Sequence, residues 1–149
     1  MENKPISQTE AQERFIQILT SVAYDSPIHS MIHLMEKGPA GGKPPQHLVR
    51  LHQWYSSLDA ESKERVQATI REAVFSAVFS CCSLLDGVAG GYPIPGQLSE
   101  FAVYLNIYQD EEAFEEEKPL DTIRVSNGSN NHEELHGLFT NALAERRGG

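Results

Sequence analysis

A long stretch without a helix breaker limits the folds open to this chain more than any other sequence feature. From Ala60 to Leu85 there is no glycine and no proline, and apolar residues recur at the spacing of one helical face. That face consists of Val66, Ile70, Ala73, Val74, Ala77, Val78, Cys81, Leu84 and Leu85. In the C-terminal half a second apolar strip joins it, formed by Phe75, Phe79 and Cys82. We therefore predict one helix over 60–85, capped by Asp59 and buried most deeply toward its end.

The predicted helix contains two thiols near its end, and a carboxylate follows it. Cys81 and Cys82 are adjacent, and a disulfide between neighbours is far from ordinary geometry. We expect both to be reduced thiols deep in the core. Asp86 follows at the helix end where the dipole disfavours an anion. We predict that it either caps the following turn or serves as a functional carboxylate.

Shorter helices are predicted on the N-terminal side. Ser7, with Glu10 three residues later, is a capping-box signature for a helix with apolar residues up to Val22. Residues 25–27, Asp-Ser-Pro, should interrupt it before a second short helix that ends at Gly38. The segment Gly38 to Pro45 is rich in glycine and proline and predicts a loop, after which a third helix begins at Gln46.

The period changes from helical to alternating after residue 96. Residues 101–108 place Val103 and Leu105 on one side and polar or tyrosine residues on the other, which predicts a strand. Thr122 to Ser126 could return antiparallel to it. A last helix should run from about Asn131 to Glu145. Its inward positions are Leu135, Leu138, Phe139, Ala142 and Leu143.

These elements predict a mainly α fold with a minor α+β part. About five helices would pack around the long central one, with a two-stranded antiparallel hairpin before the last helix. Residues 1–149 are expected to form a single globular domain.

The charge balance excludes one class of partner. Of 149 residues, 12 are Lys or Arg and 21 are Asp or Glu, for a formal net charge of −9. Because phosphate backbones are bound through clustered basic side chains, we expect no nucleic-acid partner.

Two further observations favour a cytoplasmic protein, most simply a bacterial one. Residues 1–9 lack the basic and apolar segments of a secretory signal. The longest apolar-leaning run, Ala73 to Leu85, is shorter than the about 20 residues that a bilayer span requires. We therefore expect no membrane partner.

Residues 132–136 read His-Glu-Glu-Leu-His, which resembles the zinc-binding helix of zincin metallopeptidases. The resemblance implies that His132 and His136 ligate zinc and that Glu133 acts as general base. A third ligand would have to come from upstream; His29 and His33, also four residues apart, could supply it only if the two helices lie side by side. The alternative is structural: with Asn130 as N-cap, Glu133 closes a capping box.

An acidic run lies between the two predicted strands. Its carboxylates are Asp110, Glu111, Glu112, Glu115, Glu116 and Glu117, with Phe114 inside the run. With Lys118 this stretch carries −5 of the total −9. Such a run keeps a hairpin edge soluble and prevents its pairing with other chains. It could equally steer the chain toward a basic protein, with Phe114 as the apolar anchor.

The sequence therefore favours a non-enzymatic cytoplasmic interaction protein, of the kind represented by acidic inhibitors and immunity proteins, with a basic protein as partner. Its binding residues would be those of the acidic run. We expect no catalytic residue and no cofactor under this hypothesis. The alternative is a zinc-dependent hydrolase using His132, Glu133 and His136. A homo-oligomer is also possible, because the exposed edge of the hairpin could pair with a second copy of the chain.

Overall fold

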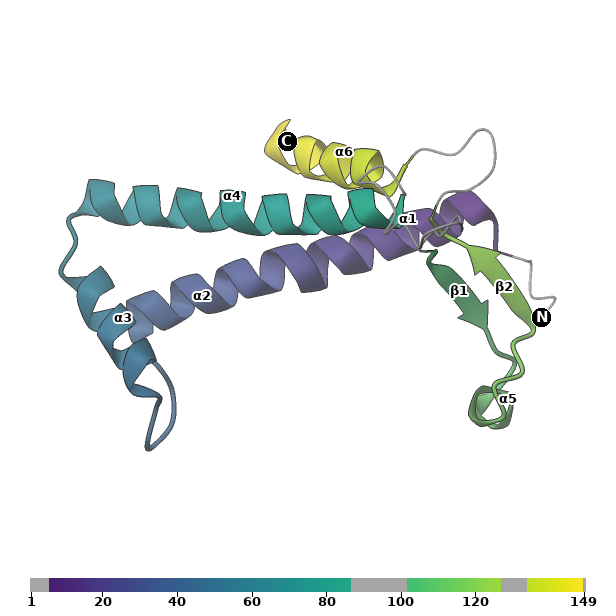
Figure 1. Cartoon of the computed structure of the whole chain (residues 1–149), viewed down its shortest axis with the longest axis horizontal. Helices are drawn as coiled ribbons and strands as arrows, with labels where there is room; N and C mark the ends of the chain where they lie inside the picture. Colours follow the sequence, from purple (N-terminus) through teal and green to yellow (C-terminus); the bar gives the residue numbers. More distant parts are fainter. Residues whose placement is uncertain (1–5, 87–101, 127–133, 149) are drawn as a thin grey trace, which may run out of the picture. The chain divides into compact units, whose positions relative to one another are not determined.

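The computed structural model describes residues 6–86, 102–126 and 134–148, with side chains up to Arg146 (Figure 1). Its backbone contacts divide the chain into two compact units. The first joins the residues up to Thr20 with those from Phe79 onward, and the second comprises Ser21–Val78. Each unit is described by itself below.

Helical residues begin where the capping signature predicts. Helix α1 spans Gln8–Leu19, and the hydroxyl of its N-cap Ser7 accepts a hydrogen bond from the backbone N–H of Glu10 at 3.2 Å. The π-helical segment η1 (Thr20–Asp25) and then α2 (Ser26–Lys37) follow without a break. Helix α2 ends at Gly38, whose φ of 84° is favourable only for glycine.

The interruption predicted at residues 25–27 is therefore wrong. Pro27 lies in the first turn of α2, directly after the π-helical segment, and Asp25 before it already has helical backbone angles. The wider turns of the π-helix just before it change the hydrogen-bonding register from i→i+4 to i→i+5. The backbone can thus remain helical past Pro27, which has no backbone N–H to donate.

The second unit is built on α2 and on α3, which spans Gln46–Ser56 and begins at the predicted residue. Met35 and Tyr55 are each 2% exposed and form its most deeply buried positions. Gln67 of the next helix donates a hydrogen bond to the Tyr55 hydroxyl at 2.9 Å. This bond satisfies the polar end of an otherwise buried ring.

Helix α4 has the predicted bounds, Ala60–Leu85. Asp59 caps it by accepting the backbone N–H of Ser62 at 2.7 Å, and this bond lowers the pKa of the Asp59 carboxyl. The residues of α4 that are buried are Val78, Cys82 and Ser83. Ala73, Ala77 and Cys81, expected on the inward face, are exposed, because burial depends on what packs against a helix as well as on the spacing of its apolar residues.

By length and composition alone, α4 could also cross a membrane. An 18-residue window within it has a mean hydropathy of 1.4, and 17% of that window is buried. Core helices of soluble proteins meet the same criterion, so this finding does not assign α4 to a bilayer.

The predicted hairpin is present in the first unit (Figure 1). Strands β1 (Tyr104–Ile107) and β2 (Asp121–Arg124) pair antiparallel, with Leu105 opposite Ile123. Tyr104 and Asn106 are exposed while Leu105 is half-buried, which confirms the alternation in this part of the predicted strand. The one-turn helix α5 (Glu111–Glu115) lies in the connection and was not predicted.

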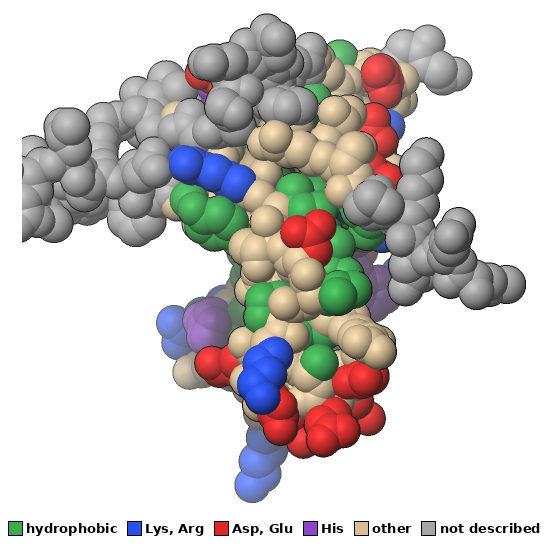
Figure 2. All heavy atoms as spheres, turned by 90° about the vertical axis from the view of Figure 1, so that its right-hand side faces the viewer, with side chains coloured by type: hydrophobic (Ala, Val, Ile, Leu, Met, Phe, Trp, Pro, Cys, Tyr) green, Lys and Arg blue, Asp and Glu red, His purple; other side chains and the backbone are tan. Residues whose placement is uncertain are grey.

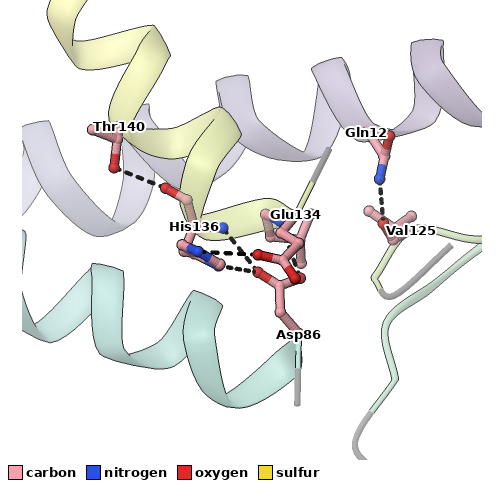
Figure 3. A network of polar contacts seen from close by, with 7 residues as sticks. Gln12, Asp86, Val125, Glu134, His136 and Thr140 are labelled. Atoms are coloured by element: carbon pink, nitrogen blue, oxygen red, sulfur yellow. Dashed lines mark hydrogen bonds and ion pairs between the residues drawn. The ribbon is translucent and has the colours of Figure 1, made fainter. Parts of the chain in front are cut away.

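The core of the first unit lies where α6 (Leu135–Gly148) packs on α1. Leu135 and Phe139 are fully buried and Ala11 is 1% exposed. The hairpin is tied to α1 by the Gln12 side chain, whose Nε2 donates to the carbonyl of Val125 at 2.9 Å (Figure 3). The prediction of a mainly helical fold, with a long helix over 60–85 and a hairpin before the last helix, is confirmed.

Candidate functional site

Asp86 joins the end of α4 to the start of α6. It is 3% exposed, and its two carboxylate oxygens accept hydrogen bonds from the backbone N–H groups of Leu135 at 3.0 Å and His136 at 2.9 Å (Figure 3). The first N–H groups of a helix have no partner within it. Asp86 thus caps α6, a helix about fifty residues away, which was neither of its predicted roles. The predicted cap of the following turn falls on residues outside the described ranges, and a role as functional carboxylate stays a prediction.

His136 faces a carboxylate with each of its ring nitrogens. Nδ1 lies 2.8 Å from Oδ2 of Asp86, and Nε2 lies 3.2 Å from Oε2 of Glu134. The ring also contacts Phe79 edge-on, with 5.4 Å between centroids. The two carboxylates occupy the in-plane directions from which a metal ion would approach the two ring nitrogens.

The zincin-like motif is only partly covered by the structure. His132 and Glu133 lie outside the described residues, and α6 begins at Leu135, so only His136 of the three is described on the helix. Among the described residues, no group of three or more His, Cys, Asp or Glu side chains is placed to hold a metal ion. The zinc hydrolase hypothesis therefore stays a prediction. His29 and His33, named above as possible further ligands, belong to the other unit.

The two cysteines differ in their surroundings. Cys82 is fully buried, and this burial, together with the negative charge of Asp86, raises the pKa of its thiol from 9.0 to about 12. Cys81 is exposed, so the expectation that both thiols lie deep in the core is wrong for Cys81. Consecutive helical positions point about 100° apart, which allows one to face the core and the other solvent.

The acidic run surrounds α5 at the end of the hairpin. Asp110 is the N-cap of α5 and accepts the N–H of Ala113 at 2.9 Å, while Glu111 and Glu112 occupy the first turn. Carboxylates in these positions are favoured by the helix dipole. Figure 2 shows the acidic side chains gathered at the lower end of this face, where α5 lies in Figure 1. All six carboxylates of the predicted run are exposed.

Three residues of the run line a cavity of about 560 Å³ together with neighbours from the strand ends. The lining residues are Asn106, Tyr108, Phe114, Glu115, Glu117 and Pro119. Phe114 is 62% exposed and contacts Tyr108 edge-on, with 5.1 Å between ring centroids and 81° between ring planes. Glu117 adopts a left-handed backbone conformation, φ 54°, where the chain turns back toward β2.

The carboxylates of the run are not equivalent. Glu116 pairs with Lys118 at 2.7 Å, whereas Glu115 and Glu117 line the cavity and have no ion-pair partner within the part of the chain that the structure describes. Glu111 and Glu112 lie outside the cavity lining. Tyr108 was not among the predicted site residues. The sequence did contain a signal for Tyr108: it is an aromatic residue at the end of the predicted strand, next to a connection that contains a second aromatic residue.

No protein-family model, curated protein or solved structure matches this chain.

Proposed function

We propose that this chain is a non-enzymatic interaction protein that binds a basic protein through the tip of its hairpin, residues 108–120. The observation that supports this most directly is the cavity described above. It places two aromatic rings beside two carboxylates, Glu115 and Glu117, that have no cationic partner among the described residues.

The walls of this cavity match the chemistry of an arginine or lysine side chain. Aromatic rings attract cations through their electron-rich faces, and Phe114 and Tyr108 supply two such rings. Carboxylates form charge-assisted hydrogen bonds with guanidinium and ammonium groups. A basic side chain that enters the cavity would therefore find both kinds of contact, and Glu115 and Glu117 would gain the counter-ion that they lack.

The surroundings of the cavity favour a basic protein over a free small molecule. Glu111 and Glu112 extend the negative surface beyond the cavity, where they can raise the rate of encounter with a positively charged surface. Phe114 and Leu120 are exposed at 62% and 64%. Exposed apolar and aromatic groups near unpaired charges are typical of an interface with an apolar core and a charged rim.

The class of partner that fits this surface is a basic protein, of the kind that small acidic inhibitors and immunity proteins neutralise. We place this interaction in the cytoplasm, because Cys81 and Cys82 are both free thiols.

A pair of matched probes tests the cavity. N-acetyl-arginine methylamide and its neutral isostere, N-acetyl-citrulline methylamide, would be titrated into the full chain and followed by NMR. We expect the arginine compound to shift the ring resonances of Tyr108 and Phe114, and the citrulline compound to shift them several-fold less. Only the former carries the charge that Glu115 and Glu117 would bind.

Two double variants with equal changes in charge supply the control. Glu115→Gln with Glu117→Gln should abolish the arginine shifts. Glu111→Gln with Glu112→Gln, outside the cavity lining, should leave most of them. Equal responses to arginine and citrulline, or equal losses in the two double variants, would contradict recognition of a basic side chain in this cavity.

A further inference from the structure

Two histidines lie one helical turn apart on α2, far in sequence from the hairpin tip. His29 and His33 are both exposed, and residues four apart on a helix lie on one face, about 6 Å apart along the axis. Together with Ser30, Ile32 and Glu36 they line an open hollow of about 570 Å³ on the surface of the second unit. Both imidazoles thus face the same small volume.

The described histidines differ in whether their ring nitrogens are free. His136 faces carboxylates with both nitrogens, and Nδ1 of His52 lies 2.8 Å from the carbonyl of Met35. Within the described residues, neither His29 nor His33 has a hydrogen-bond or ion-pair partner. In the neutral form each therefore offers an unshared lone pair to solvent.

We propose that His29 and His33 form a two-ligand site for a divalent transition metal that prefers imidazole, such as Zn²⁺. Two histidines at positions i and i+4 of a helix can ligate one zinc ion together. Water fills the remaining coordination positions, since the described residues offer no third ligand there. Glu36 is the carboxylate among the residues that line the hollow, and its Oε1 accepts a hydrogen bond from Nε2 of Gln67 at 3.3 Å.

A two-ligand site binds its metal reversibly and fixes one turn of α2 when occupied. The ion bridges two side chains of that turn, so the folded chain should gain stability as the zinc concentration rises. This site is independent of the hairpin tip, because it uses other residues and another ligand chemistry. It also differs from the zincin-like motif, which shares none of its residues.

Zinc alone is the probe for this proposal. ZnCl₂ titrated calorimetrically into the full, tag-free chain should bind at one ion per chain and shift the ring nitrogen resonances of His29 and His33. His33→Ala should weaken the binding by about tenfold or more, because it leaves a single ligand. His29→Gln should do the same. His47→Ala is the matched control: His47 is exposed on α3 and has no second histidine at the four-residue spacing.

Three results would overturn the proposal. The first is zinc affinity that His33→Ala leaves unchanged. The second is binding that only His136→Ala abolishes, which would place the metal at the zincin-like motif. The third is no heat and no resonance shift at millimolar zinc. All substituted residues of the pair are exposed, so circular dichroism of each variant should match that of the unmodified chain.

Discussion

Cys81 and Cys82 show how much the environment of a residue can differ from that of its neighbour. Both were expected in the core, yet only Cys82 is buried, at 0% exposure. Its thiol is kept protonated by burial and by the charge of Asp86, which together raise its pKa to about 12. Only the thiolate is nucleophilic, so Cys82 should be inert in the folded chain.

We predict that the folded chain at pH 8 reacts with iodoacetamide at one thiol, Cys81, and that Cys82 reacts only after denaturation. Mass spectrometry of the digested protein identifies the modified residue. Cys81→Ser should remove the fast reaction, whereas Cys82→Ser should leave its rate unchanged. Rapid labelling of Cys82 under native conditions would show that α4 is not packed as described.

The same pKa predicts how stability depends on alkaline pH. The unfolded thiol ionises near 9.0 and the folded thiol only near 12. The contribution of Cys82 to the free energy of unfolding is therefore fully present below pH 9 and is lost as the pH rises toward 12. Cys82→Ala should remove this component of the alkaline loss, which denaturant unfolding at several pH values would measure.

At the scale of the elements, the start of α6 depends on a carboxylate that α6 does not contain. Asp86 satisfies two backbone N–H groups of its first turn and also contacts the His136 ring. A negative charge is favourable at a helix N-terminus, where the dipole is positive. A single side chain thereby connects the last residues of α4 with the helix whose Leu135 and Phe139 fill the core of the first unit.

We predict that Asp86→Ala lowers the free energy of unfolding by about 3 kcal/mol, because it leaves buried donors without an acceptor. Asp86→Asn should cost less, since its amide oxygen can still accept one bond. Urea unfolding monitored by circular dichroism gives both values. Asp110→Ala, which removes the exposed cap of the short helix α5, is the control and should have a much smaller effect. A loss below about 1 kcal/mol for Asp86→Ala would contradict the capping role.

At the scale of the whole molecule, the net charge of −9 is distributed unevenly. The acidic run supplies most of it, and the structure gathers that run at the hairpin tip (Figure 2). Long-range attraction depends on this concentration of charge and acts before any contact forms. Contacts inside the cavity act only after docking, so the two effects should be separable in kinetics.

With a basic protein captured from the native host, Glu111→Gln with Glu112→Gln should lower the association rate about twofold to fivefold and weaken its dependence on salt. The dissociation rate of the complex formed by this double variant should change little. Glu115→Gln with Glu117→Gln should lower the association rate and, in addition, raise the dissociation rate, because the cavity loses its carboxylates. Surface plasmon resonance at several salt concentrations measures both rates. Association that is insensitive to all four substitutions would remove the acidic run from the proposed function.

Interactions between residues close together in the sequence determined where the helices of this protein begin and end. Ser7 and Asp59 start helices, Gly38 ends one, and the breaker-free stretch from Ala60 to Leu85 specifies α4 to the residue. Each of these signals acts within one or two helical turns, so the sequence alone is sufficient to predict it. Pro27 was misjudged because a π-helical segment, which has no comparable local signature, precedes it.

Contacts between distant residues were decided only in the tertiary structure. Asp86 reaches His136 across 50 positions, and Tyr108 meets Phe114 because a strand end and a one-turn helix fold against each other. The periodicity of apolar residues shows which side of an element can be buried. It does not specify which element will cover that side, and for that reason neither the capping of α6 nor the exposure of Cys81 followed from the sequence.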